Sequence, residues 1–112
     1  MNKEFSKRNL KRCESPYGFN HKLDSWSPSD WMVAVVGELG EAANILKKIN
    51  RVRDGVPGNK EATYTLYKKF QEEIADTYIY LDLLCQSMGV DLEKTVNEVF
   101  ESKSKEIGYI ED

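Results

Sequence analysis

The sequence predicts an all-α protein, and three observations lead to that prediction. Apolar residues recur at helical spacing in three long segments, at about residues 31–50, 64–88 and 92–107. No segment alternates apolar and polar residues for long enough to indicate a strand. Turn signals such as Asp54-Gly55 separate the first two segments. We therefore expect three long helices packed as a helical bundle.

Length and charge limit the class of protein. The chain of 112 residues is long enough for one core, so we expect a single domain over residues 1–112, with an irregular or short-helical segment at 1–29. The net charge of −3 gives no general attraction to nucleic acid or anionic membranes. No apolar run approaches the roughly 20 residues that cross a bilayer, and the basic N-terminus lacks the apolar stretch of a secretory signal. We expect a cytoplasmic protein with no membrane and no nucleic acid polymer as partner.

The first long segment begins near Pro28, where Ser29 or Asp30 can cap a helix. Its apolar positions are Trp31, Val35, Leu39, Ala42, Leu46 and Ile49. The pattern ends at about Asn50 and is followed by a loop that extends to Thr63.

The second segment runs from about Tyr64 to Met88 and ends at Gly89. One apolar stripe along it comprises Tyr67, Phe70, Ile74, Tyr78, Leu81 and Cys85. We expect Cys85 to lie in the core and both cysteines, Cys13 and Cys85, to be reduced, with a disulfide between them as the alternative. In the third segment, Asp91 can cap a helix from Leu92 to about Ile107 that ends at Gly108.

Two pairs of acidic residues lie on helix faces that also carry apolar residues. Glu38 and Glu41 are three positions apart, about 60° around a helix, and Ala34 and Ile45 fall in the same arc. Glu73 and Asp76 repeat this spacing, and the residues in their sector are Leu66, Tyr80 and Leu84. Because unpaired buried carboxylates are costly, such acids protonate, form ion pairs or bind a metal.

Four carboxylates on two helices favour a divalent-metal site, because hard oxygen ligands suit Mg²⁺ or Mn²⁺ better than zinc. Two other interpretations remain: the acids lie on solvated faces, or lysines neutralise them. The candidate lysines are Lys47, Lys48, Lys68 and Lys69. A di-iron bundle is excluded, since that site needs Glu-x-x-His on two helices and His21, the single histidine, lies outside the long segments.

The acid pairs and their neighbours resemble the MazG-like all-α nucleoside triphosphate pyrophosphohydrolases, whose signature is ExxE, a spacer and ExxD. The matching stretches are WMVAVVGELGEA at 31–42 and EEIADTYIYL at 72–81, and the resemblance covers roughly residues 24–109. It implies antiparallel helices that complete their bundle by forming a homodimer or homotetramer. It also implies Mg²⁺-dependent hydrolysis of an NTP or dNTP to the monophosphate and pyrophosphate.

The resemblance also implies roles for individual residues. Glu38, Glu41, Glu73 and Asp76 would hold Mg²⁺, with Mn²⁺ as an alternative. Tyr80 occupies a position that contacts the nucleotide in the related dCTP pyrophosphatases, and Trp26 and Trp31 fall where those relatives carry base-contacting aromatic residues. For the two tryptophans, packing in the core is at least as good an explanation.

Phosphate binding is harder to assign. Lys48 lies near the arc of the carboxylates, where it would either contact phosphate or stabilise the end of its helix. The family's Lys and Phe-Asn near the third helix are missing in register, and the candidates to substitute for them are Asn97, Lys103 or Lys105. The family's spacer is also shorter than the 31 residues between Glu41 and Glu73.

The chemistry of the acids supports the same reaction. Metal ions would bridge the carboxylates to a triphosphate and would lower the pKa of a bound water. One of the catalytic candidates, Glu38 or Glu41, would accept the proton of that water. Two alternatives are a non-catalytic module that binds a nucleotide or a partner, and a structural oligomer with lysine-paired carboxylates. The apolar stripes of the long helices favour a homo-oligomer.

Overall fold

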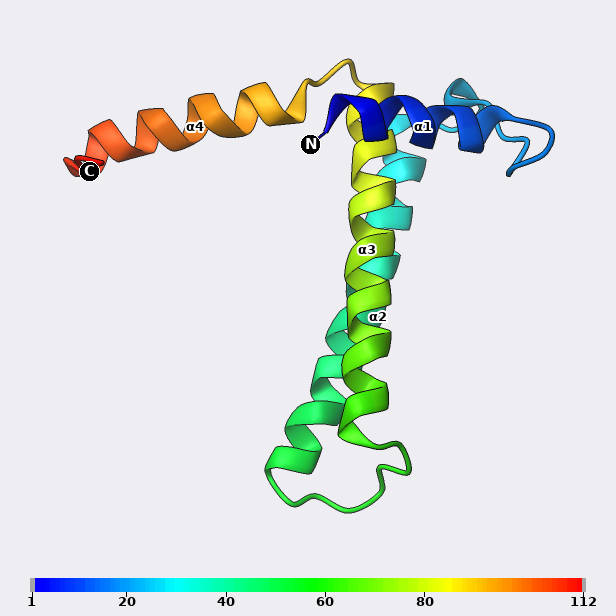
Figure 1. Cartoon of the computed structure of the whole chain (residues 1–112), viewed down its shortest axis with the longest axis vertical. Helices are drawn as coiled ribbons and strands as arrows, with labels where there is room; N and C mark the ends of the chain where they lie inside the picture. The colour runs from blue at the N-terminus through cyan, green and yellow to red at the C-terminus, as the bar shows by residue number, and fades with distance from the viewer. Residues whose placement is uncertain (1, 112) are drawn as a thin grey trace. The chain divides into compact units, whose positions relative to one another are not determined.

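The computed structural model describes residues 2–111, and these residues form helices and loops without any strand. The elements are α1 (Lys3–Glu14), the short 3₁₀ helix η1 (Leu23–Ser25), α2 (Pro28–Arg53), α3 (Thr63–Ser87) and α4 (Leu92–Ile107) (Figure 1). The predicted all-α class is confirmed. Within the described part of the chain, no helix combines the length and apolar character needed to cross a bilayer.

The chain divides into two compact units, which we describe separately. One unit is Trp26–Leu81, with α2 and most of α3. The other combines Met1–Ser25 with Asp82–Asp112, and so contains α1, η1, the end of α3 and α4.

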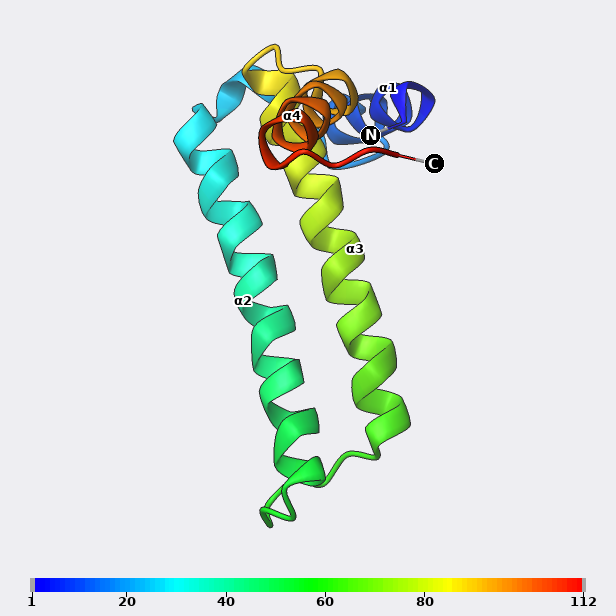
Figure 2. The same ribbon diagram turned by 90° about the vertical axis from the view of Figure 1, so that its left-hand side faces the viewer.

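In the first unit, α2 and α3 lie side by side and run in opposite directions (Figure 2). Buried apolar side chains line the contact between them. These are Trp31, Val35, Ala42 and Leu66. The antiparallel pair follows from the loop at residues 54–62, which reverses the chain with Gly55 and Gly58 at positive φ.

The start of α2 differs from the prediction. Ser27 is the N-cap, because its side chain accepts a hydrogen bond from the Asp30 amide while the Asp30 carboxylate accepts one from the Ser27 amide. This capping box places Pro28 in the first turn, where its fixed φ suits a helix and its missing N–H is not needed. Asp30 therefore contributes to the cap from inside the helix.

The buried face of α3 also differs from the predicted stripe. Tyr67, Ile74 and Tyr78 are exposed, whereas Leu66 and Leu84 are buried. The difference corresponds to a rotation of about 100°, one residue along a helix. The face that α3 buries is thus the one that carries Glu73 and Asp76, and the tyrosine-rich stripe faces outward.

In the second unit, α1 is attached to the end of α3 through Asp82. The Asp82 side chain is 3% exposed and accepts hydrogen bonds from Ser6 Oγ and from Asn9 Nδ2, the latter at 2.9 Å. Gln86 Nε2 donates to the same carboxylate, also at 2.9 Å. These polar contacts therefore hold α1 against the end of α3.

Both cysteines are free in this unit. Cys13 is buried, and its Sγ donates to the His21 carbonyl oxygen at 3.1 Å. Cys85, which was expected in the core, is only half-buried. Burial raises the pKa of both thiols above the ordinary value, which keeps them protonated and weakly reactive.

Candidate metal centre

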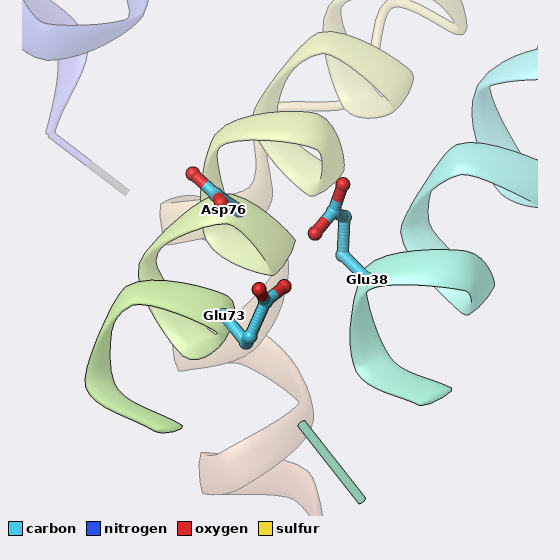
Figure 3. A group of neighbouring side chains, drawn as sticks. All are labelled: Glu38, Glu73 and Asp76. Atoms are coloured by element: carbon cyan, nitrogen blue, oxygen red, sulfur yellow. The ribbon is translucent and has the colours of Figure 1, made fainter. Parts of the chain in front are cut away.

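Three of the four predicted carboxylates converge between α2 and α3. Figure 3 shows Glu38 extending from α2 toward Glu73 and Asp76 on α3. One carboxylate oxygen of each residue lies within 4.8 Å of the others. Glu38 and Glu73 are half-buried, and Asp76 is exposed. The arrangement is a shallow carboxylate cluster that is open to solvent on the side of Asp76.

Local sequence explains the positions on each helix. Glu73 and Asp76 are three residues apart, so both project from the same side of α3. That side also carries the buried Leu66, which packs against the α2 core. Packing of the apolar residues therefore turns the acids toward Glu38.

Glu73 is the most constrained member of the cluster. Its Oε2 atom is buried and has no hydrogen-bond partner among the described residues. A buried carboxylate oxygen without a donor loses its hydrogen bonds to water and gains no hydrogen bond within the protein. This oxygen needs either a proton or a cation nearby.

Within the part of the chain that the structure describes, no lysine or arginine forms an ion pair with the cluster. The ion pairs within residues 2–111 leave out all four predicted carboxylates. Lys48 and Lys69, two of the lysines considered as neutralising partners, both bind Glu61, and Lys48 Nζ lies 3.6 Å from Glu61 Oε1. The interpretation that lysines neutralise the cluster therefore finds no support in this structure.

Hydrogen bonding between neighbouring carboxyl groups, with their repulsion as a smaller cause, raises the pKa values of Glu41 and Glu73. The nearby Glu38 carboxyl raises the pKa of Glu73, with loss of solvent as a second cause. Glu73 in turn raises the pKa of Glu41, which lies outside the group of three close oxygens. Each shift means that the ionised carboxylates destabilise one another.

The donor set fits a hard divalent cation. Every candidate ligand is a carboxylate oxygen, which is the ligand type of Mg²⁺ and Mn²⁺, and zinc's preferred thiolate and imidazole ligands are absent from the cluster. Glu38, Glu73 and Asp76 would hold the ion. The Glu73 Oε2 atom, which has no hydrogen-bond partner among the described residues, is already desolvated and would be one of the ligand atoms.

The predicted aromatic residues gather in the same unit. The rings of Trp26 and Trp31 meet edge to face with their centroids 4.6 Å apart, and the centroid of Tyr80 lies 6.2 Å from that of Trp31. Trp31 is 2% exposed and belongs to the core, as the packing alternative predicted. Trp26 is 37% exposed, so it is the tryptophan that can present a face to a ligand.

The remaining predicted substrate residues either have another partner or belong to the other compact unit. Lys48 is engaged with Glu61, as described above. Asn97 and Lys103 are on α4, which belongs to the other compact unit, and Lys103 Nζ is 3.3 Å from Glu106. Glu61 could not be identified from the sequence as a partner of these lysines, because its eight-residue separation from Lys69 does not match the spacing of a helical ion pair.

The two glycines beside the first acid pair leave open space. A Cβ atom added to Gly37 or Gly40 would meet no atom within 4 Å. No described part of this chain therefore requires a close approach at these positions. Their place beside Glu38 and Glu41 leaves room for a ligand or a second molecule.

The chain matches no protein-family model, no curated protein and no solved structure. The resemblance to the MazG-like enzymes therefore rests on the two motifs and their neighbours.

Proposed function

We propose that the chain is a MazG-like, divalent-metal-dependent pyrophosphohydrolase that converts an NTP or dNTP to the monophosphate and pyrophosphate. The observation that carries the proposal is the buried, unpartnered Glu73 Oε2 inside a cluster of carboxylates from two helices. Structural acids of a helical domain do not need such an arrangement, and it is unfavourable without a cation.

The charge of the substrate supports the same conclusion. A nucleoside triphosphate carries about four negative charges, so bare carboxylates would repel it. When bound, Mg²⁺ would supply the positive charge that joins carboxylates to phosphates and would make a coordinated water more acidic. The chain's own part is to provide fixed oxygen ligands at Glu38, Glu73 and Asp76.

Glu41 is the best candidate for the proton acceptor. It is exposed, and it does not belong to the three oxygens that lie within 4.8 Å of one another. Its pKa is raised by Glu73, which makes it a stronger base than an isolated glutamate. We therefore assign Glu41 the role of taking the proton from the attacking water, and Glu38 the role of ligand.

The nucleotide base would contact the exposed side of Trp26. The Trp31 ring packs against Trp26, and the Tyr80 ring lies next to Trp31. We infer that these contacts fix the orientation of Trp26. In this proposal Trp31 is a positioning residue.

We also propose that a second copy of the chain completes the bundle, in a homodimer or homotetramer. Large apolar side chains on the outer faces of α2 and α3 are at least 39% exposed; they are Leu39, Leu46, Tyr67, Ile74 and Tyr78. Helix α4 buries none of its residues within the described chain. Surfaces of this kind are typical of subunit interfaces. A monomer in light scattering at micromolar concentration would contradict this assembly.

Pyrophosphate release from the eight common NTPs and dNTPs, with Mg²⁺ or with EDTA, tests the reaction. We expect release from at least one nucleotide that stops in EDTA and falls about 100-fold or more in Glu38→Gln. The matched control is Glu72→Gln, an exposed acid next to the cluster, which should retain full activity. Nucleotide binding with Mg²⁺ but without pyrophosphate would instead support the non-catalytic module.

A further inference from the structure

A tight turn after α1 carries two solvent-exposed aromatic side chains. The Gly18 and Asn20 amides both donate to the Ser15 carbonyl oxygen at 2.9 Å, and the Phe19 amide donates to the Arg12 carbonyl oxygen at 3.1 Å. A Cβ atom at Gly18 would collide with that Arg12 oxygen, so the turn requires glycine there. The segment is therefore a defined structure.

This turn presents Tyr17 and Phe19 to solvent. Tyr17 is 101% exposed and Phe19 is 70% exposed. Large aromatic residues usually contribute to stability by burial, and these two contribute little of that kind. A well-ordered turn that displays two rings is a feature of binding surfaces.

Helix α1 places a set of cations beside the turn. Its basic residues are Lys3, Lys7, Arg8, Lys11 and Arg12. None of them takes part in an ion pair within residues 2–111. The Arg12 guanidinium lies 5.3 Å from the centroid of the Phe19 ring, which leaves its N–H groups available.

Three of these cations share a groove with the exposed tyrosine. Arg8, Lys11 and Arg12 line a groove of about 470 Å³ together with Ser15 and Tyr17. Its remaining lining residues are Phe5, Asn9 and Gly18, so no acidic side chain among residues 2–111 lines it. Positive charge and an aromatic ring thus occur together in one concave surface.

We propose that this groove binds single-stranded nucleic acid, with phosphates on Arg8, Lys11 and Arg12 and a base stacked on Tyr17. Proteins that bind single strands combine a cationic groove with stacking aromatic rings. An anionic membrane fits less well, because an interfacial helix needs a broad exposed apolar face. On α1 the larger apolar side chains, Phe5 and Leu10, are half-buried.

The net charge of −3 led us to expect no nucleic acid polymer as a partner, and the proposal departs from that expectation. That number averages over the whole chain, whereas the six Lys and Arg residues before residue 26 outnumber three acids. At physiological salt, charges act over about 8 Å, so a ligand in the groove responds to the local cations.

Fluorescence anisotropy with a labelled 12-nucleotide oligo(dT) or oligo(U) tests the proposal on the full chain. We expect binding in 50 mM salt that weakens about 20-fold at 200 mM, as about three phosphate contacts predict. Tyr17→Ala should weaken binding about tenfold, whereas Tyr64→Ala, which removes a ring 72% exposed and also beside a lysine, should not.

A second set of variants tests the role of the positive charges. Arg8→Ala with Lys11→Ala should weaken binding more than Lys60→Ala with Lys94→Ala, although both pairs remove two exposed cations. Circular dichroism of each variant checks that its helices are intact. No binding in 50 mM salt or equal losses in the control variants would overturn the proposal. So would equal affinity for a mononucleotide, or binding to vesicles with 20% phosphatidylserine without binding to the oligonucleotide.

Discussion

Glu38 and Glu73 belong to different helices, yet a carboxylate oxygen of each lies within 4.8 Å of the other. Buried apolar side chains of both helices, including Trp31 on α2 and Leu66 on α3, hold the two helices together and so keep these like charges close. The Glu73 carboxylate is further destabilised because its buried Oε2 has no donor. The cluster is therefore unfavourable in the metal-free protein, and we expect a bound cation to make it favourable.

Glu73→Gln should raise the melting temperature of the metal-free protein by about 2–4 °C, because it removes one of the repelling charges from a partly buried position. The same variant should lose most of the stabilisation that wild type gains from 5 mM Mg²⁺. Differential scanning fluorimetry with and without EDTA measures both effects. Glu72→Gln, an exposed neighbour on α3, should behave as wild type. A lower melting temperature for metal-free Glu73→Gln would show that the ionised carboxylate stabilises the fold.

The pH dependence of stability follows from the raised pKa values of Glu41 and Glu73. Between the ordinary glutamate pKa and the raised folded-state pKa, the folded protein binds more protons than the unfolded chain. The contribution of these groups to stability therefore falls as pH rises through that interval.

Urea unfolding without metal, at pH values from about 4.5 to 7, tests this dependence. Glu61 acts in the opposite direction, since its hydrogen bond with Lys69 lowers its pKa and its stabilisation is lost as pH falls. The difference between wild type and Glu41→Gln isolates the cluster. We expect the advantage of the variant to grow with pH, and an advantage that shrinks would contradict the assigned repulsion.

Alanine variants of Trp31 and Trp26 should separate an effect on stability from an effect on substrate binding. Trp31 is 2% exposed, so Trp31→Ala should cost about 3–5 kcal/mol in urea unfolding. Trp26 is 37% exposed and should cost less than half of that when replaced by alanine. In the proposed enzyme, Trp26→Ala should raise KM. Equal stability losses for the two variants would contradict the assignment of Trp31 to the core and Trp26 to the ligand face.

Asp82→Ala should destabilise the second unit by about 2–4 kcal/mol, because it removes the buried carboxylate that accepts hydrogen bonds from Ser6, Asn9 and Gln86. Amide hydrogen exchange should then increase throughout α1. Asp24→Ala is the matched control, since Asp24 is exposed. Unchanged exchange in α1 after loss of Asp82 would show that other contacts hold this helix.

Helix ends could be predicted where local chemistry sets them. Asp91 caps α4 through the Lys94 amide and Gly108 ends it at φ 73°, so the predicted bounds from Leu92 to Ile107 match the structure. The start of α2 was misplaced because Ser29 and Asp30 are also good caps. Pro28 at the first helical turn is the signal that favours Ser27.

Three of the four carboxylates named from the sequence come together in the structure, whereas Glu41 lies outside that group. The spacing of Glu73 and Asp76 predicts a shared face, and the apolar Leu66 in that sector indicated the partial burial found for Glu73, but Asp76 is exposed. The contact with Glu38 depends on how α2 and α3 rotate about their axes, which the tyrosine-rich stripe of α3 left ambiguous. Both faces of α3 are apolar enough to pack, and only the tertiary structure distinguishes them.

Titration with Mn²⁺, followed by the electron paramagnetic resonance signal of the free ion, tests the metal site most directly. Wild type should bind Mn²⁺, and Mg²⁺ should compete. Glu38→Gln and Asp76→Asn should each weaken binding by about tenfold or more, while Glu72→Gln binds as wild type. No binding by the folded wild-type protein, or equal affinity in all four proteins, would contradict a metal site formed by these carboxylates.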